Sequence, residues 1–77
     1  MKKIKQFDLT INDLDLDNFP EKGIFIPESD YGLAEIYLSE DNGYILYEIP
    51  SFGGEPMKYG EILYDPKEVI EIIQSWT

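Results

Sequence analysis

The chain has 77 residues, 43% of them hydrophobic and 29% charged, and a formal net charge of −10. This length allows one domain, residues 1–77, and the composition is that of a folded, soluble chain. A charge this negative repels nucleic acid and anionic membranes, so we expect direct binding to neither. The excess of acidic side chains favours a basic protein partner, with solubility alone as the competing explanation.

The sequence lacks both Cys and His. It therefore has no thiol nucleophile, no imidazole base and no thiolate or imidazole ligand for a metal. We recognise no nucleophile–base pair, phosphate loop or metal spacing, so we expect no catalytic residues, no metal, no cofactor and no enzymatic activity. The missing Cys is compatible with the cytoplasm, and residues 1–9 lack the apolar run of a secretory signal. We therefore expect a cytoplasmic protein.

Residues 1–19 have the least regular pattern. Phe7, Leu9 and Ile11 alternate with polar residues, which predicts a short strand followed by an extended arm. The alternative is a short helix, with Thr10 as its N-cap and Asp13 as its third residue.

Three Asp residues in this segment occupy alternate positions, as do the first ligands of an EF-hand calcium loop. They are Asp13, Asp15 and Asp17. Such a loop also needs Gly at its sixth and Glu at its twelfth position, where this sequence has Asn18 and Ile24. We therefore interpret the acids as a solvated ridge beside buried leucines.

The clearest strand signal spans residues 33–49 and predicts a β-hairpin. Asn42 and Gly43 tolerate the positive φ of a two-residue type I′ turn, which would pair Leu38 with Tyr47. The two predicted faces carry Ala34, Ile36, Leu38, Ile45, Tyr47 and Ile49 on one side and Leu33, Glu35, Tyr37, Ser39, Tyr44, Leu46 and Glu48 on the other. A longer loop that includes Asp41 is the alternative, and a shift of one residue would mix the faces.

The second predicted face is not polar, since it carries Leu33, Tyr37, Tyr44 and Leu46 among its charges. A sheet with one solvated face shows cleaner alternation of apolar and polar residues. We therefore expect a cover over this face, supplied either by the apolar side chains of residues 7–19 or by a partner.

Further strands are predicted at residues 23–27 and 57–64, bounded by turns rich in Gly and Pro. Asp65 as N-cap, Pro66 as the first helical residue and Glu68 as the third predict a C-terminal helix. Its apolar stripe consists of Val69, Ile72, Ile73 and Trp76. The predicted fold class is α+β, a small antiparallel β-meander of three to five strands with one C-terminal α-helix packed on one face.

Acidic and aromatic residues alternate along the predicted meander, and Tyr is enriched at protein interfaces. Phe52 is an apolar ring in a loop of Gly and Pro, which favours contact with a partner. The predicted partner-binding residues are Glu35, Tyr37, Tyr44, Glu48, Phe52, Glu55 and Tyr59. For Tyr44, Phe52 and Tyr59, packing within the domain is the competing interpretation.

These features predict a small acidic protein-binding domain without catalysis, of the inhibitor, immunity or adaptor type. Its partner would be a basic or nucleic-acid-binding protein. The alternative is a homo-oligomeric structural or accessory domain, such as a homodimer, that buries its second sheet face against a copy of itself.

Overall fold

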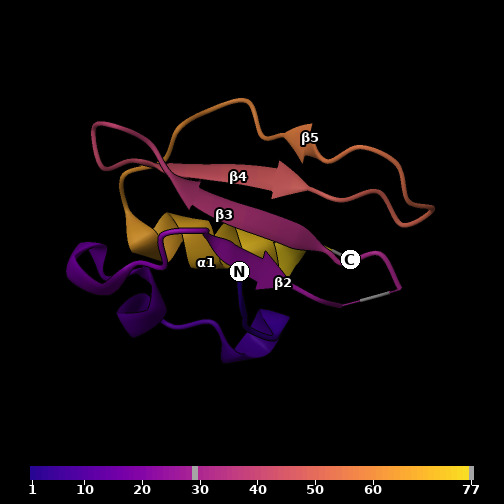
Figure 1. Ribbon diagram of the computed structural model, residues 1–77, viewed down its shortest axis with the longest axis horizontal. Coiled ribbons are helices and arrows are strands. Elements are labelled where there is room, and N and C mark those ends of the chain that lie inside the picture. The colour runs from indigo at the N-terminus through magenta and orange to yellow at the C-terminus, as the bar shows by residue number, and fades with distance from the viewer. Residues whose placement is uncertain (29, 77) are drawn as a thin grey trace.

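The computed structural model describes residues 1–28 and 30–76, which form a five-stranded sheet and one C-terminal α-helix (Figure 1). The strands, in their order across the sheet, are β1 (Lys2–Lys3), β2 (Ile24–Ile26), β3 (Ala34–Leu38), β4 (Tyr44–Glu48) and β5 (Met57–Lys58). The other elements are the 3₁₀ helices η1 (Gln6–Asp8), η2 (Ile11–Leu14) and η3 (Leu16–Asn18) and the helix α1 (Pro66–Ser75). The predicted α+β fold is confirmed, although the sheet is mixed because β1 pairs in parallel with β2.

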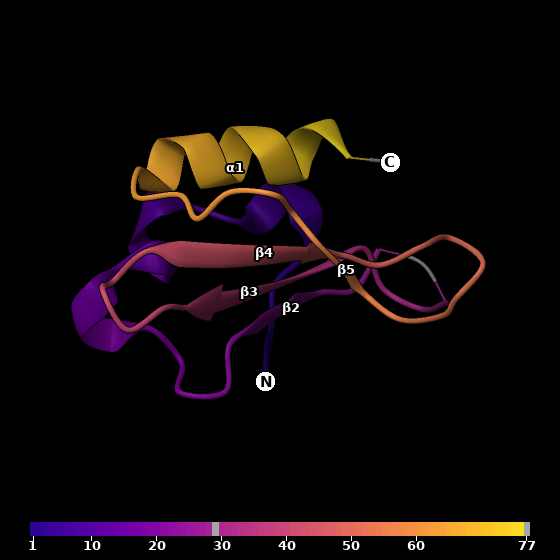
Figure 2. The same cartoon turned by 90° about the horizontal axis from the view of Figure 1, so that it is seen from above.

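Helix α1 begins where its sequence signals predict. The carboxylate of Asp65 accepts a hydrogen bond of 2.9 Å from the backbone nitrogen of Lys67, and Pro66 is the first helical residue. Val69 and Ile73 are fully buried against the sheet. Figure 2 shows α1 lying along one face of the sheet. Burial of this apolar stripe stabilises a helix that would be marginal alone.

The connection from β1 to β2, residues 4–23, is called here the N-terminal arm. A parallel strand pair needs a crossover connection of a dozen or more residues, and the arm supplies it. Its helices η1 and η2 contact α1 on the side of the sheet that α1 covers (Figure 2), where Leu9 and Leu14 join the core. The arm therefore covers part of the second predicted face, since Tyr44 donates to the carbonyl of Leu14 and contacts the ring of Phe19, whereas Tyr37 lies on the opposite side of the sheet.

The arm is folded into three 3₁₀ turns, so the strand predicted around residues 7–11 is wrong. The helical alternative predicted the correct cap. The carboxylate of Asp13 accepts hydrogen bonds from the backbone nitrogen and the hydroxyl of Thr10, at 2.8 and 3.1 Å. Asp15 caps the next turn by accepting from the backbone nitrogen of Asp17 and the side-chain amide of Asn18. These acids therefore hold the arm's backbone in shape.

Strands β3 and β4 form the predicted hairpin, but in another register. Leu38 pairs with Tyr44 and Ile36 with Leu46, whereas the two-residue turn predicted that Leu38 pairs with Tyr47. The difference is an odd number of residues, and side chains alternate between faces with a period of two. The shift therefore turns the β4 side chains to the opposite face relative to those of β3.

The hairpin loop explains the shift. The backbone nitrogen of Ser39 donates to the carbonyl of Gly43 at 2.8 Å, and that of Asn42 donates to the carbonyl of Ser39 at 3.2 Å. Asn42 has a φ of 66°. A type I turn followed by a left-handed residue is the usual three-residue hairpin loop. The longer loop that includes Asp41 is thus the one adopted.

The face of the sheet beneath α1 and the arm forms the core. It is built from side chains that are at most 3% exposed, namely Ile24, Ile26, Ala34, Ile36, Tyr44 and Leu46. Each such Ile or Leu stabilises the fold by about 1.5–3 kcal/mol relative to an exposed position. Both covering elements therefore lie on one side, and the opposite side of the sheet is left open to solvent.

Candidate functional site

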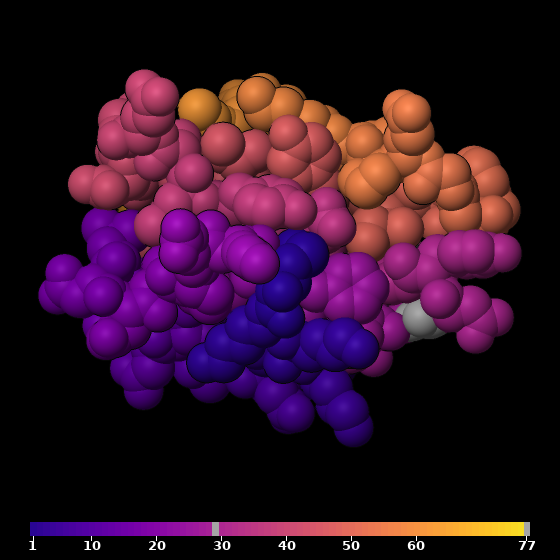
Figure 3. All heavy atoms as spheres, in the orientation of Figure 1, coloured from indigo at the N-terminus to yellow at the C-terminus, as the bar shows by residue number. Residues whose placement is uncertain are grey.

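The face of the sheet opposite α1 is called here the open face. Its side chains from the three central strands are Phe25, Glu35, Tyr37, Ile45 and Tyr47, and all five are partly exposed. Figure 3 views the molecule from this side, with the side chains of the hairpin at the surface between the indigo N-terminal segment and the orange segment near β5. Large aromatic rings that remain accessible on an acidic domain make this face the best candidate for a binding surface.

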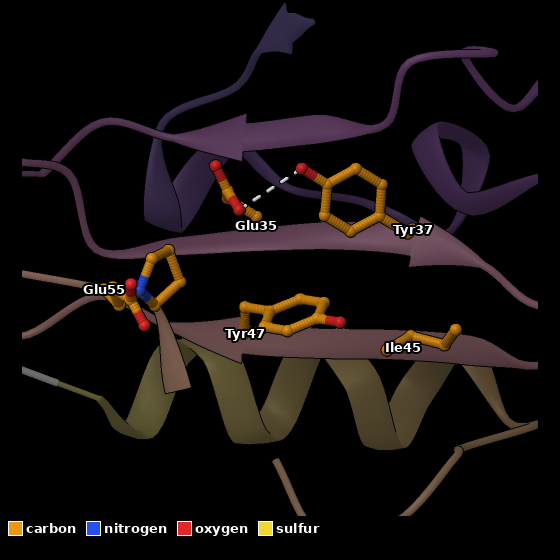
Figure 4. Close-up of a pocket in the computed structure, with 6 residues that line it drawn as sticks. Glu35, Tyr37, Ile45, Tyr47 and Glu55 are labelled. Atoms are coloured by element: carbon orange, nitrogen blue, oxygen red, sulfur yellow. Dashed lines mark hydrogen bonds between the residues drawn. The ribbon is translucent and has the colours of Figure 1, made fainter. Parts of the chain in front are cut away.

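A groove of about 430 Å³ runs across the open face. Its lining residues come from β3, β4 and the segment that leads into β5, and they are Glu35, Tyr37, Ile45, Tyr47, Glu55 and Pro56. Figure 4 shows the two tyrosines side by side above the strands, with Glu35 and Glu55 toward one end and Ile45 toward the other. The groove thus combines an aromatic floor with two carboxylates.

Two cross-strand pairs arrange the floor of the groove. Glu35 lies opposite Tyr47, and Tyr37 lies opposite Ile45, so the two rings meet on the diagonal between the strands. Their centroids are 5.7 Å apart with an interplanar angle of 85°. This edge-to-face arrangement places the positive edge of one ring on the negative face of the other. The tyrosines therefore hold one another in place.

Gly23 allows Tyr37 to pack down onto the backbone. Its φ is 87°, and a Cβ at this position would lie 2.8 Å from Cδ1 of Tyr37 and 2.7 Å from the carbonyl oxygen of Ile36. A side chain there would both strain the backbone and displace the ring. The turn before β2 consequently determines the position of the Tyr37 ring, one of the two rings that form the floor of the groove.

Tyr37 also orients a carboxylate. Its hydroxyl donates a hydrogen bond of 3.2 Å to Oε1 of Glu35 (Figure 4) and lies 4.0 Å from Sδ of Met1. Partial burial, and next the negative charge of Glu35, raise the pKa of Tyr37 above its ordinary value of 10.0. The phenol therefore keeps its proton at neutral pH, and Glu35 keeps its donor while its other acceptor positions remain available.

The structure brings three of the seven predicted partner-binding residues together in the groove. These are Glu35, Tyr37 and Glu55. Phe52 is 84% exposed at the loop between β4 and β5, outside the groove lining. Beside it, Tyr31 packs its ring about 3.1 Å from the position that a Cβ of Gly53 would occupy. Phe52 is therefore accessible, as expected, but belongs to a separate patch at the end of the sheet.

The other three predicted residues lie on the covered side. Tyr44 is 3% exposed, and its hydroxyl donates to the backbone carbonyl of Leu14, so its expected place on the second face is wrong. Tyr59 packs on Trp76, with ring centroids 6.1 Å apart. Glu48 pairs with Ala34 and therefore shares the core side at the end of the sheet. The shifted register of β4 accounts for Tyr44 and Glu48.

Three groove residues were missing from the sequence prediction. The predicted two-residue turn places Tyr47 and Ile45 on the face opposite Glu35 and Tyr37, which is the wrong orientation for β4. Pro56 lies in a loop and has no pattern that would point to the sheet. The alternative of a longer hairpin loop that includes Asp41 is the signal that identifies the two β4 residues, because a three-residue loop gives the observed register.

A second hollow, of about 410 Å³, lies between the arm and the start of α1. Its lining includes Ile11, Leu16 and Tyr64, which are exposed, and Leu14 and Tyr44, which are buried. It lacks the paired carboxylates and stacked rings of the groove on the open face, which therefore remains the better candidate site.

Among residues 1–28 and 30–76, no group of three or more Asp or Glu side chains is arranged to hold a metal ion. In that same part of the chain, no helix has the length and apolar character needed to cross a membrane. Comparisons of the chain with protein-family models, with curated proteins and with solved structures give no match.

Proposed function

We propose that the protein is a small acidic binding domain without catalytic activity, of the inhibitor, immunity or adaptor type, and that it engages a basic protein through its open face. The observation that supports this most is the sidedness of the fold. Both α1 and the arm pack on one face of the sheet, and the other face keeps Tyr37 and Tyr47 accessible beside two carboxylates. Partly exposed aromatic residues supply contact area, and the acids supply charge complementarity.

The net charge of −10 also favours a basic partner. It would steer a positively charged protein toward the domain and speed their association, with an effect that weakens as salt increases. A nucleic-acid-binding protein is one such partner, because its basic surface would meet the carboxylates of the open face.

The edges of the sheet are less suited to binding than its open face. Both edge strands, β1 and β5, have two residues each, and they carry Lys2, Lys3 and Lys58. Short edge strands with Lys discourage the addition of another strand. Recognition through side chains on the open face is therefore the mode that the fold favours.

A homodimer through the open face is the second candidate, favoured by the apolar part of the groove around Ile45 and the two rings. A two-fold dimer would, however, place Glu35 and Glu55 of one copy near their counterparts in the other. Repulsion between these acids, added to two charges of −10, opposes such a dimer at low salt. Sedimentation at micromolar concentration tests it, and a tight dimer that is insensitive to salt would contradict the heterotypic proposal.

Charge reversal with a matched control tests the proposed function. The open-face variant is Glu35→Lys with Glu55→Lys, and the control is Glu40→Lys with Glu71→Lys, two exposed acids in the hairpin loop and on α1. Both variants change the net charge by the same amount. Proteins retained at low salt by the wild type and the control, but not by the open-face variant, are the expected result. Equal retention by all three, or by none, would contradict the proposal.

A further inference from the structure

We propose that the groove on the open face is a subsite for one arginine side chain of the protein partner. This inference rests on the proposed function and specifies the chemistry of the contact. The six described residues that line the groove include two acids and no base, and both carboxylates lie toward one end of the groove, beside the tyrosine rings. A cation is the group whose charge complements this lining.

The geometry favours a guanidinium over an ammonium group. A guanidinium is planar, is weakly hydrated, stacks on aromatic rings and pairs with carboxylates through two parallel hydrogen bonds. The groove offers both kinds of contact, since Tyr47 lies directly across the strands from Glu35. The hydrogen bond from Tyr37 already orients the carboxylate of Glu35, which reduces the loss of side-chain freedom on binding.

The groove has room for an arginine side chain. Its volume of about 430 Å³ lies near the lower end of typical ligand sites, and it is open to solvent along its length. The side chain of Ile45 and the ring of Pro56 provide apolar surface for the methylene stem of an arginine. An extended partner segment could thus place the stem along the strands and the head group near the acids.

Lys58 supplies an internal test of this assignment. It pairs with Tyr47 across β4 and β5, so its side chain projects from the same face at the rim of the groove. Its positive charge would repel an incoming arginine. Removal of that charge by Lys58→Gln should therefore tighten the binding of a cation, whereas it should leave the binding of a neutral group unchanged.

The experiment is an NMR titration of the 15N-labelled full chain with the blocked tripeptide Gly-Arg-Gly. We expect saturable shifts at Tyr37, Ile45 and Tyr47, with a Kd of about 1 mM. The same peptide with citrulline, which keeps the shape but lacks the charge, should bind at least about tenfold more weakly. The lysine peptide should bind at least about threefold more weakly than the arginine peptide.

Variants localise the site. Glu35→Gln and Glu55→Gln should each weaken the binding of the arginine peptide by about threefold to tenfold. Lys58→Gln should strengthen its binding by about twofold. The control Glu71→Gln, on α1, should change nothing. The amide spectrum of each variant reports whether its fold is retained.

Equal binding of the citrulline peptide, equal or tighter binding of the lysine peptide, or no saturable shift up to about 10 mM arginine peptide would each overturn the inference. The result is separable from the proposed function. If the charge-reversed open-face variant loses its partner but the arginine peptide does not bind, only the arginine subsite fails. If the peptide binds at the groove and no partner depends on it, only the proposed function fails.

Discussion

The hydroxyl of Tyr44 donates a hydrogen bond to the backbone carbonyl of Leu14 and so ties strand β4 to the N-terminal arm inside the core. Both residues are at most 3% exposed, so neither group has ready access to water. Tyr44 reaches the arm because it shares a face with Ile36 and Leu46. This bond therefore links the register of the hairpin to the side of the sheet on which the arm packs.

Tyr44→Phe should lower the free energy of unfolding by about 1–3 kcal/mol, because it leaves the Leu14 carbonyl buried without its donor. Denaturation by urea measures this change. Tyr31→Phe, at a side chain that is 56% exposed, is the matched control and should change stability by less than about 0.5 kcal/mol. Equal stability of the two variants would show that the Tyr44 bond contributes nothing.

Gln6 caps the C-terminal end of α1 from the arm. Its buried side-chain amide donates to the carbonyl oxygens of Ile73 and Trp76, at 2.8 and 2.6 Å. The Ile73 carbonyl also accepts from the backbone nitrogen of Trp76 at 3.2 Å, so Gln6 adds a second donor there and supplies a donor to Trp76. Gln6→Glu should destabilise the protein by about 2–4 kcal/mol at pH 7, since a carboxylate would face two carbonyls and the negative end of the helix dipole.

Gln6→Met keeps the length of the side chain but not its donors, and it serves as the control. This variant should lower the free energy of unfolding by about 1–3 kcal/mol at any pH. The additional loss in Gln6→Glu should shrink as pH falls and the new carboxyl group takes up a proton. Denaturation curves at pH 4 and pH 7 separate the two effects, and identical pH profiles would contradict the capping role.

The Asp41–Tyr64 pair predicts how stability depends on pH. Hydrogen bonds from Ser39 and then from Tyr64, the latter of 2.5 Å, lower the pKa of Asp41 below 3.8, and the same bond to Asp41 raises the pKa of Tyr64 above 10.0. The Asp41 contribution is present above pH 3.8 and is lost as pH falls through the lowered value. The Tyr64 contribution is present below pH 10.0 and is lost as pH rises through the raised value.

Asp41→Asn should therefore flatten the acid side of the stability profile, and Tyr64→Phe should flatten its alkaline side. Both groups are exposed, so the changes should be small. An NMR titration of the Asp41 carboxyl carbon measures the lowered pKa directly. A midpoint at or above 3.8 in the wild type would contradict the bond, and Asp8→Asn should leave that midpoint unchanged.

Gly23 should not tolerate a side chain. Gly23→Ala would place a Cβ 2.7 Å from the carbonyl oxygen of Ile36 at a φ of 87°, so we expect a loss of about 2 kcal/mol or more. Gly60→Ala is the control, because no heavy atom beyond its two chain neighbours lies within 4 Å of its Cβ position. It should be neutral or stabilise by up to about 1 kcal/mol. Thermal denaturation of the two variants compares them, and similar midpoints would contradict the role of Gly23.

Sequence patterns predicted the elements whose signals lie within a few residues. The cap of α1 at Asp65 and Pro66, its apolar stripe, and the short strand before Pro27 all agree with the structure. These features depend on φ preferences, on nearby hydrogen bonds and on periodicity along one element, so they can be read locally. The acidic, Cys-free and His-free composition needs no structure at all.

The strand pairings could not be read in this way. Asn42 is compatible with both a two-residue and a three-residue hairpin loop, and the choice reverses which side of β4 faces the core. The parallel pairing of β1 is also hidden, because it consists of two lysines held by backbone bonds from Lys2 to Gly23 and from Ile4 to Phe25. Such backbone bonds carry no side-chain pattern.

The sequence by itself thus determined an acidic α+β domain with a capped C-terminal helix and a hairpin around residues 33–49. Only the tertiary structure decided that Tyr47 rather than Tyr44 faces solvent, and that the arm packs beside α1. The physical reason is that burial is a property of contacts between distant segments. Ile24 and Ile26 can pack with Ile36 and Leu46 in one core only if β4 adopts the observed register, and this choice leaves the open face.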